Sequence, residues 1–129
     1  MGRFIARMHN VGRTSSFQHR HQIEIDRMGN EPAAYLQQNG FIPGYLEIAY
    51  QTLVDDLLKE LQAAFDRCGN YQSIRLHGDC HRSNVLWTDD GPHFVDLDDC
   101  CNGPAIQDLW CLLSGERAVM TEQMCDLLE

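Results

Sequence analysis

The spacing of apolar residues along the chain predicts a mostly helical protein with a few short strands. Near the start, apolar residues recur every three to four positions, and Gly12 is a typical helix end. The polar residues Arg13–Asn30 follow, where we expect a short helix near Ser16–His21 and then a loop. Pro32 begins another short helix that ends at the pair Asn39-Gly40.

The longest predicted helix runs from about Tyr45 to Arg67, and Cys68-Gly69-Asn70 ends it. One stripe along it is apolar and consists of Leu46, Tyr50, Leu53, Leu57, Leu61 and Ala64. The charged residues lie largely off that stripe, and they are Asp55, Asp56, Lys59 and Glu60. Two later helices are expected at Ala105–Leu113 and Thr121–Leu128.

Three short apolar runs predict strands at Ser73–Leu76, Val85–Trp87 and His93–Val95. Between the last two lies Asp89-Asp90-Gly91-Pro92, a strong turn sequence that predicts a hairpin. The chain is therefore an α+β unit, mostly helical, with a small sheet that carries a polar loop.

Length, charge and hydropathy narrow the class of protein. The 129 residues allow at most one domain, and they suffice to bury a core. The net charge of −9 argues against nucleic acid or an anionic membrane as the main partner. No apolar run approaches the length needed to span a membrane, and no signal-peptide pattern is present.

The six cysteines suit a reducing cytoplasm. None forms a Cys-x-x-Cys pair, and Cys100 and Cys101 are adjacent, which favours neither a zinc site nor a disulfide. Cys111 and Cys125 fall at helical positions and are expected to fill the core. Cys80 lies beside Asp79 in the polar loop, where we expect a structural role rather than a reactive thiol.

The polar loop holds the candidate chemistry. Asp79 is followed five residues later by Asn84, and Asp96 comes twelve residues after that, beyond the predicted hairpin. The hairpin brings Asn84 and Asp96 toward each other, so their oxygens can share one Mg²⁺, a cation that prefers carboxylate and amide oxygens. Asp79 would face an incoming hydroxyl group, orient it and accept its proton. This is the arrangement of a phosphotransferase that uses ATP.

Each of these residues also has an ordinary structural interpretation. A loop Asp such as Asp79 commonly caps a turn or helix, Asn84 suits a turn, and Asp96 with Asp98 and Asp99 can form a solvated acidic turn. The joint pattern is what favours phosphoryl transfer.

A metal-dependent hydrolase is the alternative that the histidines suggest, because His77, His81 and His93 lie near Asp79 and Asp96 in sequence. Their order contains neither a helical His-x-x-x-His nor a His-x-His pair. We interpret His77 as a support of the loop backbone and His93 as a surface residue of its strand.

The motifs His77-Gly78-Asp79, Asn84 and Val95-Asp96-Leu97-Asp98 resemble the signature of the aminoglycoside phosphotransferase and choline kinase superfamily of kinase-like folds. The run Asn102–Trp110 is similar to that of bacterial stress-response serine/threonine protein kinases within it, as is the opening Gly2–His9. The resemblance implies a kinase-like large lobe over residues 1–129, without the N-terminal lobe that clamps ATP.

By that resemblance Asp79 is the catalytic base, and Asp96 is a second catalytic residue. Asn84 and Asp96 bind Mg²⁺ and, through it, ATP. Asp108 would tie down the loop by accepting backbone hydrogen bonds, although it could equally be a carboxylate at a helix N-terminus. The chain lacks a glycine-rich phosphate loop, and its only lysine, Lys59, lies in a long helix where we expect it to be solvated.

The leading hypothesis is thus an ATP-dependent phosphotransferase, a cytoplasmic serine/threonine protein kinase, expected to be monomeric. Its partners are ATP, Mg²⁺ and a hydroxyl-bearing substrate, with no nucleic acid or membrane. The alternatives are a kinase for a small molecule, of the aminoglycoside, choline or homoserine type, and a non-catalytic kinase fragment that acts as a binding module.

Overall fold

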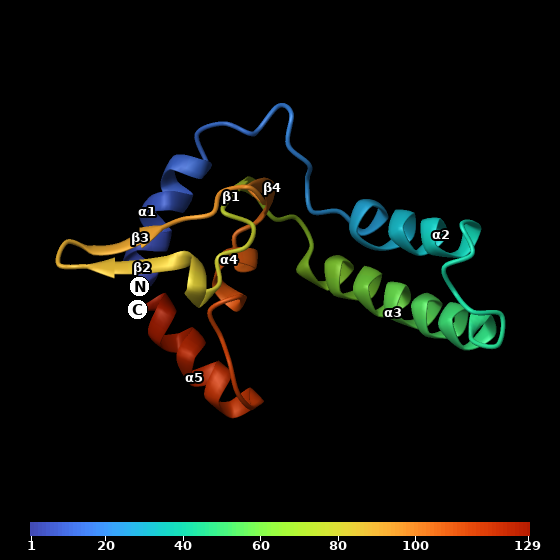
Figure 1. The fold of residues 1–129 in the computed structure, drawn as a ribbon. Coiled ribbons are helices and arrows are strands. Elements are labelled where there is room, and N and C mark those ends of the chain that lie inside the picture. The colour runs from blue at the N-terminus through green and yellow to red at the C-terminus, as the bar shows by residue number, and fades with distance from the viewer. The chain divides into compact units, whose positions relative to one another are not determined.

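Most of the segments with helical spacing of apolar residues are helices in the structure, a computed structural model that describes residues 1–129. Helices and short antiparallel strands make it an α+β fold, as the sequence predicts (Figure 1). The chain divides into two units. Unit 1 comprises Met1–Gln22 with Gln72–Glu129, and unit 2 comprises Ile23–Tyr71.

Two antiparallel strand pairs form the sheet structure of unit 1. Strands β2 (Val85–Thr88) and β3 (Gly91–Phe94) make the expected hairpin. Strand β1 (Ser73–Leu76) pairs instead with β4 (Cys101–Pro104). Strand β4 is not predicted by its sequence, because the residues of its Asn-Gly-Pro segment are depleted in strands. Its pairing with β1 overrides that preference.

Helix α1 (Gly2–Gly12) is fixed against β1. Its buried residues are Ile5, His9 and Gly12, whereas the apolar Val11 is 64% exposed. A Cβ atom at Gly12 would overlap the carbonyl oxygen of Arg75, so the helix backbone approaches the strand as closely as glycine allows. The Nη2 group of Arg75 also donates to the carbonyl oxygen of Val11 at 2.9 Å.

The core of unit 1 is small and joins helices to the hairpin. Ile5 of α1, Val85 of β2 and Leu112 are buried together. Partly buried side chains surround them, namely Met1, Met8, Phe94, Leu109 and Leu127. Each fully buried aliphatic side chain stabilises the fold by about 1.5–3 kcal/mol, so this cluster determines how α1 and the hairpin pack.

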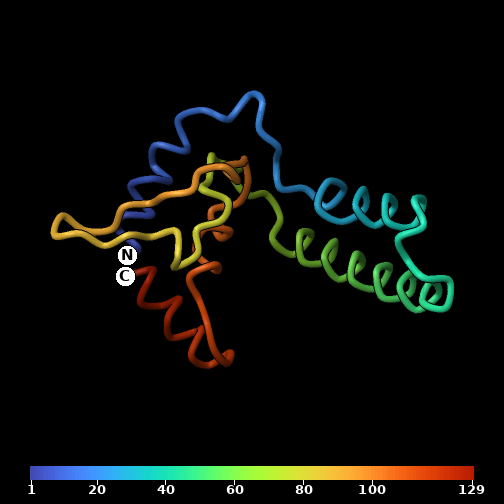
Figure 2. The backbone as a smooth tube through the Cα atoms, viewed as in Figure 1, coloured from blue at the N-terminus to red at the C-terminus, as the bar shows by residue number.

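The remaining helices of unit 1 follow Asn102 and differ at their ends from the expected ranges. Helix α4 covers only Ile106–Trp110, and α5 begins earlier than predicted, at Arg117, and ends at Leu128. Helices α1 and α5 contact each other, and the two chain ends lie near each other within unit 1 (Figure 2).

The predicted helix near Ser16–His21 is wrong. The backbone of Phe17 is instead bound at both its N–H and its C=O by the side-chain amide of Asn102, at 2.9 and 3.0 Å. The carbonyl oxygen of His21 accepts the backbone N–H of Asn102. Because these backbone groups pair with a residue far along the chain, they are not available for helical hydrogen bonds.

Unit 2 is entirely helical, with a π-helix η1 (Asp26–Asn30), α2 (Glu31–Gln38) and α3 (Glu47–Cys68). The π-helix lies where we expected a loop. The apolar stripe of α3 is largely exposed, with Leu53 and Leu57 each 59% accessible, and the neighbouring Val54 and Leu58 are half-buried instead. Lys59 is solvated, as predicted, 3.7 Å from Asp56.

No helix of the structure is both long enough and apolar enough to cross a membrane.

The contact between Gly12 and Arg75 gives a test of this packing. Replacing a helical Gly by Ala usually stabilises a protein by up to about 1 kcal/mol. We expect Gly12→Ala to lower the free energy of unfolding by about 1–3 kcal/mol, because its new methyl group meets backbone that cannot move aside. Chemical denaturation measures the change.

The matched control is Gly44→Ala, because a Cβ atom there would meet nothing within 4 Å. It should leave stability unchanged or raise it slightly. Equal stability of Gly12→Ala and the wild type would contradict the close seating of α1 on β1.

Candidate active site

The polar loop that follows β1 is held in an unusual backbone path. Gly78 has a φ angle of 90°, and a Cβ atom on it would overlap the carbonyl oxygen of Asp99. Only glycine fits both constraints. A single 3₁₀ turn, η2 (Arg82–Asn84), then leads into β2, so the loop is short and closely packed.

Asp108 anchors the loop from α4. Its carboxylate is fully buried and accepts the backbone N–H groups of His77 at 3.1 Å and Gly78 at 2.9 Å. The predicted tie between Asp108 and the loop is thus confirmed. Asp108 also lies in the first turn of its helix, so the simpler interpretation holds as well.

Two further side chains join this anchor that the sequence analysis did not identify. His9 of α1 lies with its Nε2 atom 2.9 Å from Oδ2 of Asp108. Gln107 donates its Nε2 group to the carbonyl oxygen of Gly78 at 2.9 Å. The only sequence signal for His9 is a polar residue at helical spacing from Ile5 and Gly12, on the face that turns out to be buried.

The loop brings Asp79 and Asn84 together. The Nδ2 group of Asn84 donates to the backbone carbonyl oxygen of Asp79 at 3.0 Å and lies 3.5 Å from its carboxylate Oδ2. This orientation leaves the amide oxygen of Asn84 as a free acceptor. Asp79 is half-buried, and its other neighbour is Nε2 of His81 at 3.4 Å.

Asp96 lies just beyond the hairpin, in the backbone next to the loop. The N–H of the preceding residue, Val95, donates to the carbonyl oxygen of Asn84 at 3.0 Å. The carbonyl oxygen of Val95 is 2.8 Å from Nε2 of His77, which confirms that this histidine supports the backbone. Two bonds of Val95 thus join the backbone just before Asp96 to the segment that contains His77, Asp79 and Asn84.

Asp96 is also the one non-glycine residue with a positive φ angle, 61°. Such a conformation costs free energy and persists only where the surroundings enforce it, which is commonly at functional sites. Its carboxylate is exposed and makes no hydrogen bond or ion pair within the chain. Both of its oxygens are thus free to bind a ligand from solution.

The donor set that these residues offer consists of oxygen atoms. One amide oxygen and one carboxylate suit Mg²⁺, which is usually held by one or two protein carboxylates and completed by phosphates and water. No group of three or more His, Cys, Asp or Glu side chains is arranged to hold a metal ion. His77, His81 and His93 therefore do not assemble the ligand set of a metal-dependent hydrolase.

Burial favours the protonated form of the thiols around the loop. Burial, with a smaller contribution from the Asp108 carboxylate, raises the pKa of Cys80 to about 12 and that of Cys101 to about 11. Burial also raises the pKa of Cys111. All six cysteines are free, and Cys125 is exposed, so the expectation that it fills the core is wrong.

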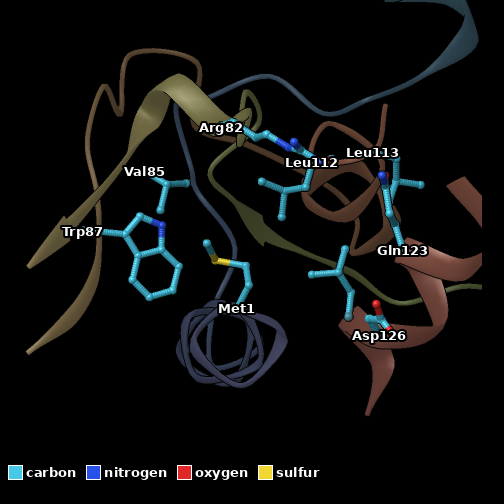
Figure 3. A pocket seen from close by; sticks show the side chains of 9 residues that line it. Met1, Arg82, Val85, Trp87, Leu112, Leu113, Gln123 and Asp126 are labelled. Atoms are coloured by element: carbon cyan, nitrogen blue, oxygen red, sulfur yellow. The ribbon is translucent and has the colours of Figure 1, made fainter. Parts of the chain in front are cut away.

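A cavity of about 440 Å³ lies elsewhere in unit 1 (Figure 3). Figure 3 shows the side chains of Trp87, Val85, Met1 and Leu112 around it, with Asp126 and Gln123 at its α5 side. None of Asp79, Asn84 or Asp96 lines it. The candidate site is therefore the open loop and hairpin, not this apolar pocket.

Comparison with known proteins finds one matching family and several similar proteins. A family model described as the phosphotransferase enzyme family matches residues 1–126. Stress response kinase A from Shigella flexneri is 42% identical over 129 residues, which is 100% of this chain and 38% of the relative. The protein of that name from Escherichia coli (strain K12) is 41% identical over the same span.

A third relative is the serine/threonine protein kinase RdoA from Salmonella typhimurium, which is 40% identical over 129 residues. The chain spans 38% of the length of these curated relatives.

The raised thiol pKa values predict how the cysteines react. At pH 8, a pKa of about 12 in place of 9.0 lowers the reactive thiolate fraction about a thousandfold. We expect iodoacetamide to label the exposed Cys68 and Cys125 rapidly and to leave Cys80 unlabelled until the chain is unfolded in guanidinium chloride. Peptide mass spectrometry resolves the sites, and fast labelling of Cys80 in the folded chain would contradict its burial.

Proposed function

The chain belongs to the phosphotransferase enzyme family, and from this premise we propose that its protein transfers the γ-phosphoryl group of ATP to a hydroxyl group. The observation that carries the proposal is the set of hydrogen bonds joining Asp79, Asn84 and the residue before Asp96. These bonds bring together the half-buried carboxylate of Asp79, the amide of Asn84 and the carboxylate of Asp96 in one loop and hairpin. The amide oxygen of Asn84 and the carboxylate of Asp96 have no hydrogen-bond partner within the chain.

In this proposal Asp79 is the catalytic base. Its carboxylate orients the substrate hydroxyl and accepts its proton as the oxygen attacks phosphorus. Asn84 donates a hydrogen bond to the backbone carbonyl of Asp79, and this bond fixes the loop that carries the Asp79 carboxylate. Most of the rate enhancement would come from such positioning, because the transferred group needs little covalent assistance from the protein.

Asn84 and Asp96 would hold a Mg²⁺ ion, which would supply positive charge against the phosphates of ATP. The fit rests on their chemistry, since the amide oxygen of Asn84 and the carboxylate of Asp96 have no partner within the chain. The positive φ angle of Asp96 supports this role, because such strained conformations are common at functional sites.

We further propose that the phosphate acceptor is a serine or threonine hydroxyl of a protein. The support is that one relative, 40% identical over the chain, is named a serine/threonine protein kinase. The six free cysteines agree with a location in the reducing cytoplasm. Phosphorylation of a small-molecule alcohol instead of a protein would contradict this part of the proposal.

The substitution Asp79→Asn tests the role of the base. In the full-length protein it should lower kcat by at least about a thousandfold and leave the affinity for magnesium-ATP within about twofold, because a base acts on the chemical step. Transfer of labelled γ-phosphate followed by phosphoamino-acid analysis measures the rate and identifies the acceptor residue.

The control for this experiment is Asp89→Asn, the same change at an exposed residue of the hairpin turn. It should keep wild-type activity. A strong loss of ATP binding in Asp79→Asn would instead assign Asp79 to metal binding or to structure.

Calorimetric titration of magnesium-ATP into the 129-residue chain tests the metal ligands. We expect binding that is lost in Asp96→Ala and kept in Asp98→Ala, an exposed neighbour on the same segment. Equal binding by both variants would exclude Asp96 as a ligand. A folded chain that binds no magnesium-ATP would show that these residues do not form a nucleotide site by themselves.

A further inference from the structure

His9 contacts the anchor of the loop from a distant part of the chain. It lies on α1, is 6% exposed, and approaches Oδ2 of Asp108, which is 99 residues away in sequence. It is the one side chain that forms an ion pair or hydrogen bond with this carboxylate, because the other two partners of Asp108 are backbone groups.

The two oxygens of Asp108 divide their donors unequally. Oδ1 accepts the backbone N–H of Gly78 alone, and Oδ2 accepts both the backbone N–H of His77 and Nε2 of His9. Since Asp108 is fully buried, water cannot replace a donor that is removed. The imidazole of His9 therefore holds the same carboxylate oxygen that accepts the loop N–H of His77.

No other side chain forms a hydrogen bond with this carboxylate. The thiols of Cys80, Cys100, Cys101 and Cys111 are titratable neighbours of Asp108, and burial raises the pKa of each. A neutral thiol is a weak hydrogen-bond donor.

The loop needs this anchor because glycine has no intrinsic preference for the φ angle of 90° that Gly78 adopts. Gly78 immediately precedes Asp79 and lacks the Cβ atom that would restrict its dihedral angles. The direction of Asp79 then depends on where the carboxylate of Asp108 holds the N–H groups of residues 77 and 78.

Helix α1 can supply this support because it is itself held in place. Gly12 meets the backbone of Arg75, and Ile5 is buried in the core with Val85. His9 lies between these two contact points along the helix. Its position is therefore set by β1 and β2, the strands that flank the loop.

We propose that His9 is a positioning residue for phosphoryl transfer: through Asp108 it holds the loop so that Asp79 faces the substrate hydroxyl. The inference rests on the proposed function. Loss of this contact displaces the reacting carboxylate, and a displacement of an ångström can lower a rate by about a hundredfold.

The kinetic test uses the full-length protein. His9→Ala should lower kcat by about tenfold to a hundredfold. It should leave KM for ATP within about threefold, because Asn84 and Asp96 are unchanged. His9→Gln should restore kcat to within about threefold of the wild type, since its amide Nε2 group can donate to Asp108 as the imidazole does. His19→Ala, at an exposed histidine, is the control.

Amide hydrogen exchange gives a readout that does not require activity. In His9→Ala the amides of His77 and Gly78 should exchange at least about tenfold faster, while those of Ile74 and Leu76 in β1 keep their protection. In His9→Gln the first two amides should stay protected.

The outcomes separate the two proposals. If the wild type transfers phosphate, Asp79→Asn abolishes transfer and His9→Ala keeps wild-type kcat, the role of His9 is wrong and the proposed function stands. If the wild type transfers no phosphate, the proposed function fails, and exchange alone decides whether His9 holds the loop. Uniformly faster exchange throughout unit 1 would reduce His9 to a general contributor to stability.

Discussion

The buried carboxylate of Asp108 is the interaction on which the candidate site depends. A charge removed from water is costly unless hydrogen bonds compensate it, and here two backbone N–H groups and one imidazole do so. The requirement works in both directions. Asp108 needs those donors to be stable in the core, and the loop needs Asp108 to hold His77 and Gly78 in a conformation that their own backbone preferences do not impose.

A second constraint fixes the hairpin relative to the loop. His77 contributes its backbone N–H to Asp108 and its ring nitrogen to the carbonyl oxygen of Val95, so one residue joins helix α4, the loop and the end of β3. The strained residue Asp96 comes directly after that bond. The free energy stored in its positive φ angle can be tolerated because the neighbouring backbone is held at two points.

The two units differ in how they use their apolar residues. Unit 1 buries a small cluster that fixes α1 against the hairpin. Unit 2 keeps the longest apolar stripe, on α3, largely exposed, while Val54 and Leu58 on the adjacent face are half-buried and Leu58 lies next to Gly29 of η1. The periodicity of the sequence predicts this apolar face, but it does not specify which neighbouring element, if any, covers it.

The sequence by itself determined the local elements and the chemical types of the site. Helix spacing located α1, α2 and α3, the Asp-Asp-Gly-Pro turn located the β2–β3 hairpin, and the motif containing Asp79 and Asn84 pointed to a phosphotransferase. These are short-range features, because periodicity, turn residues and motif spacing are properties of neighbouring positions.

The tertiary structure decided what joins distant positions. It paired β4 with β1 although the sequence of β4 is poor in strand formers. It prevented a helix at Ser16–His21, because Asn102 binds the backbone there. It also placed His9 next to Asp108, which is 99 residues away in sequence. The physical reason is that a buried polar group must be satisfied by whichever partner the packing brings near, and that partner can come from anywhere in the chain.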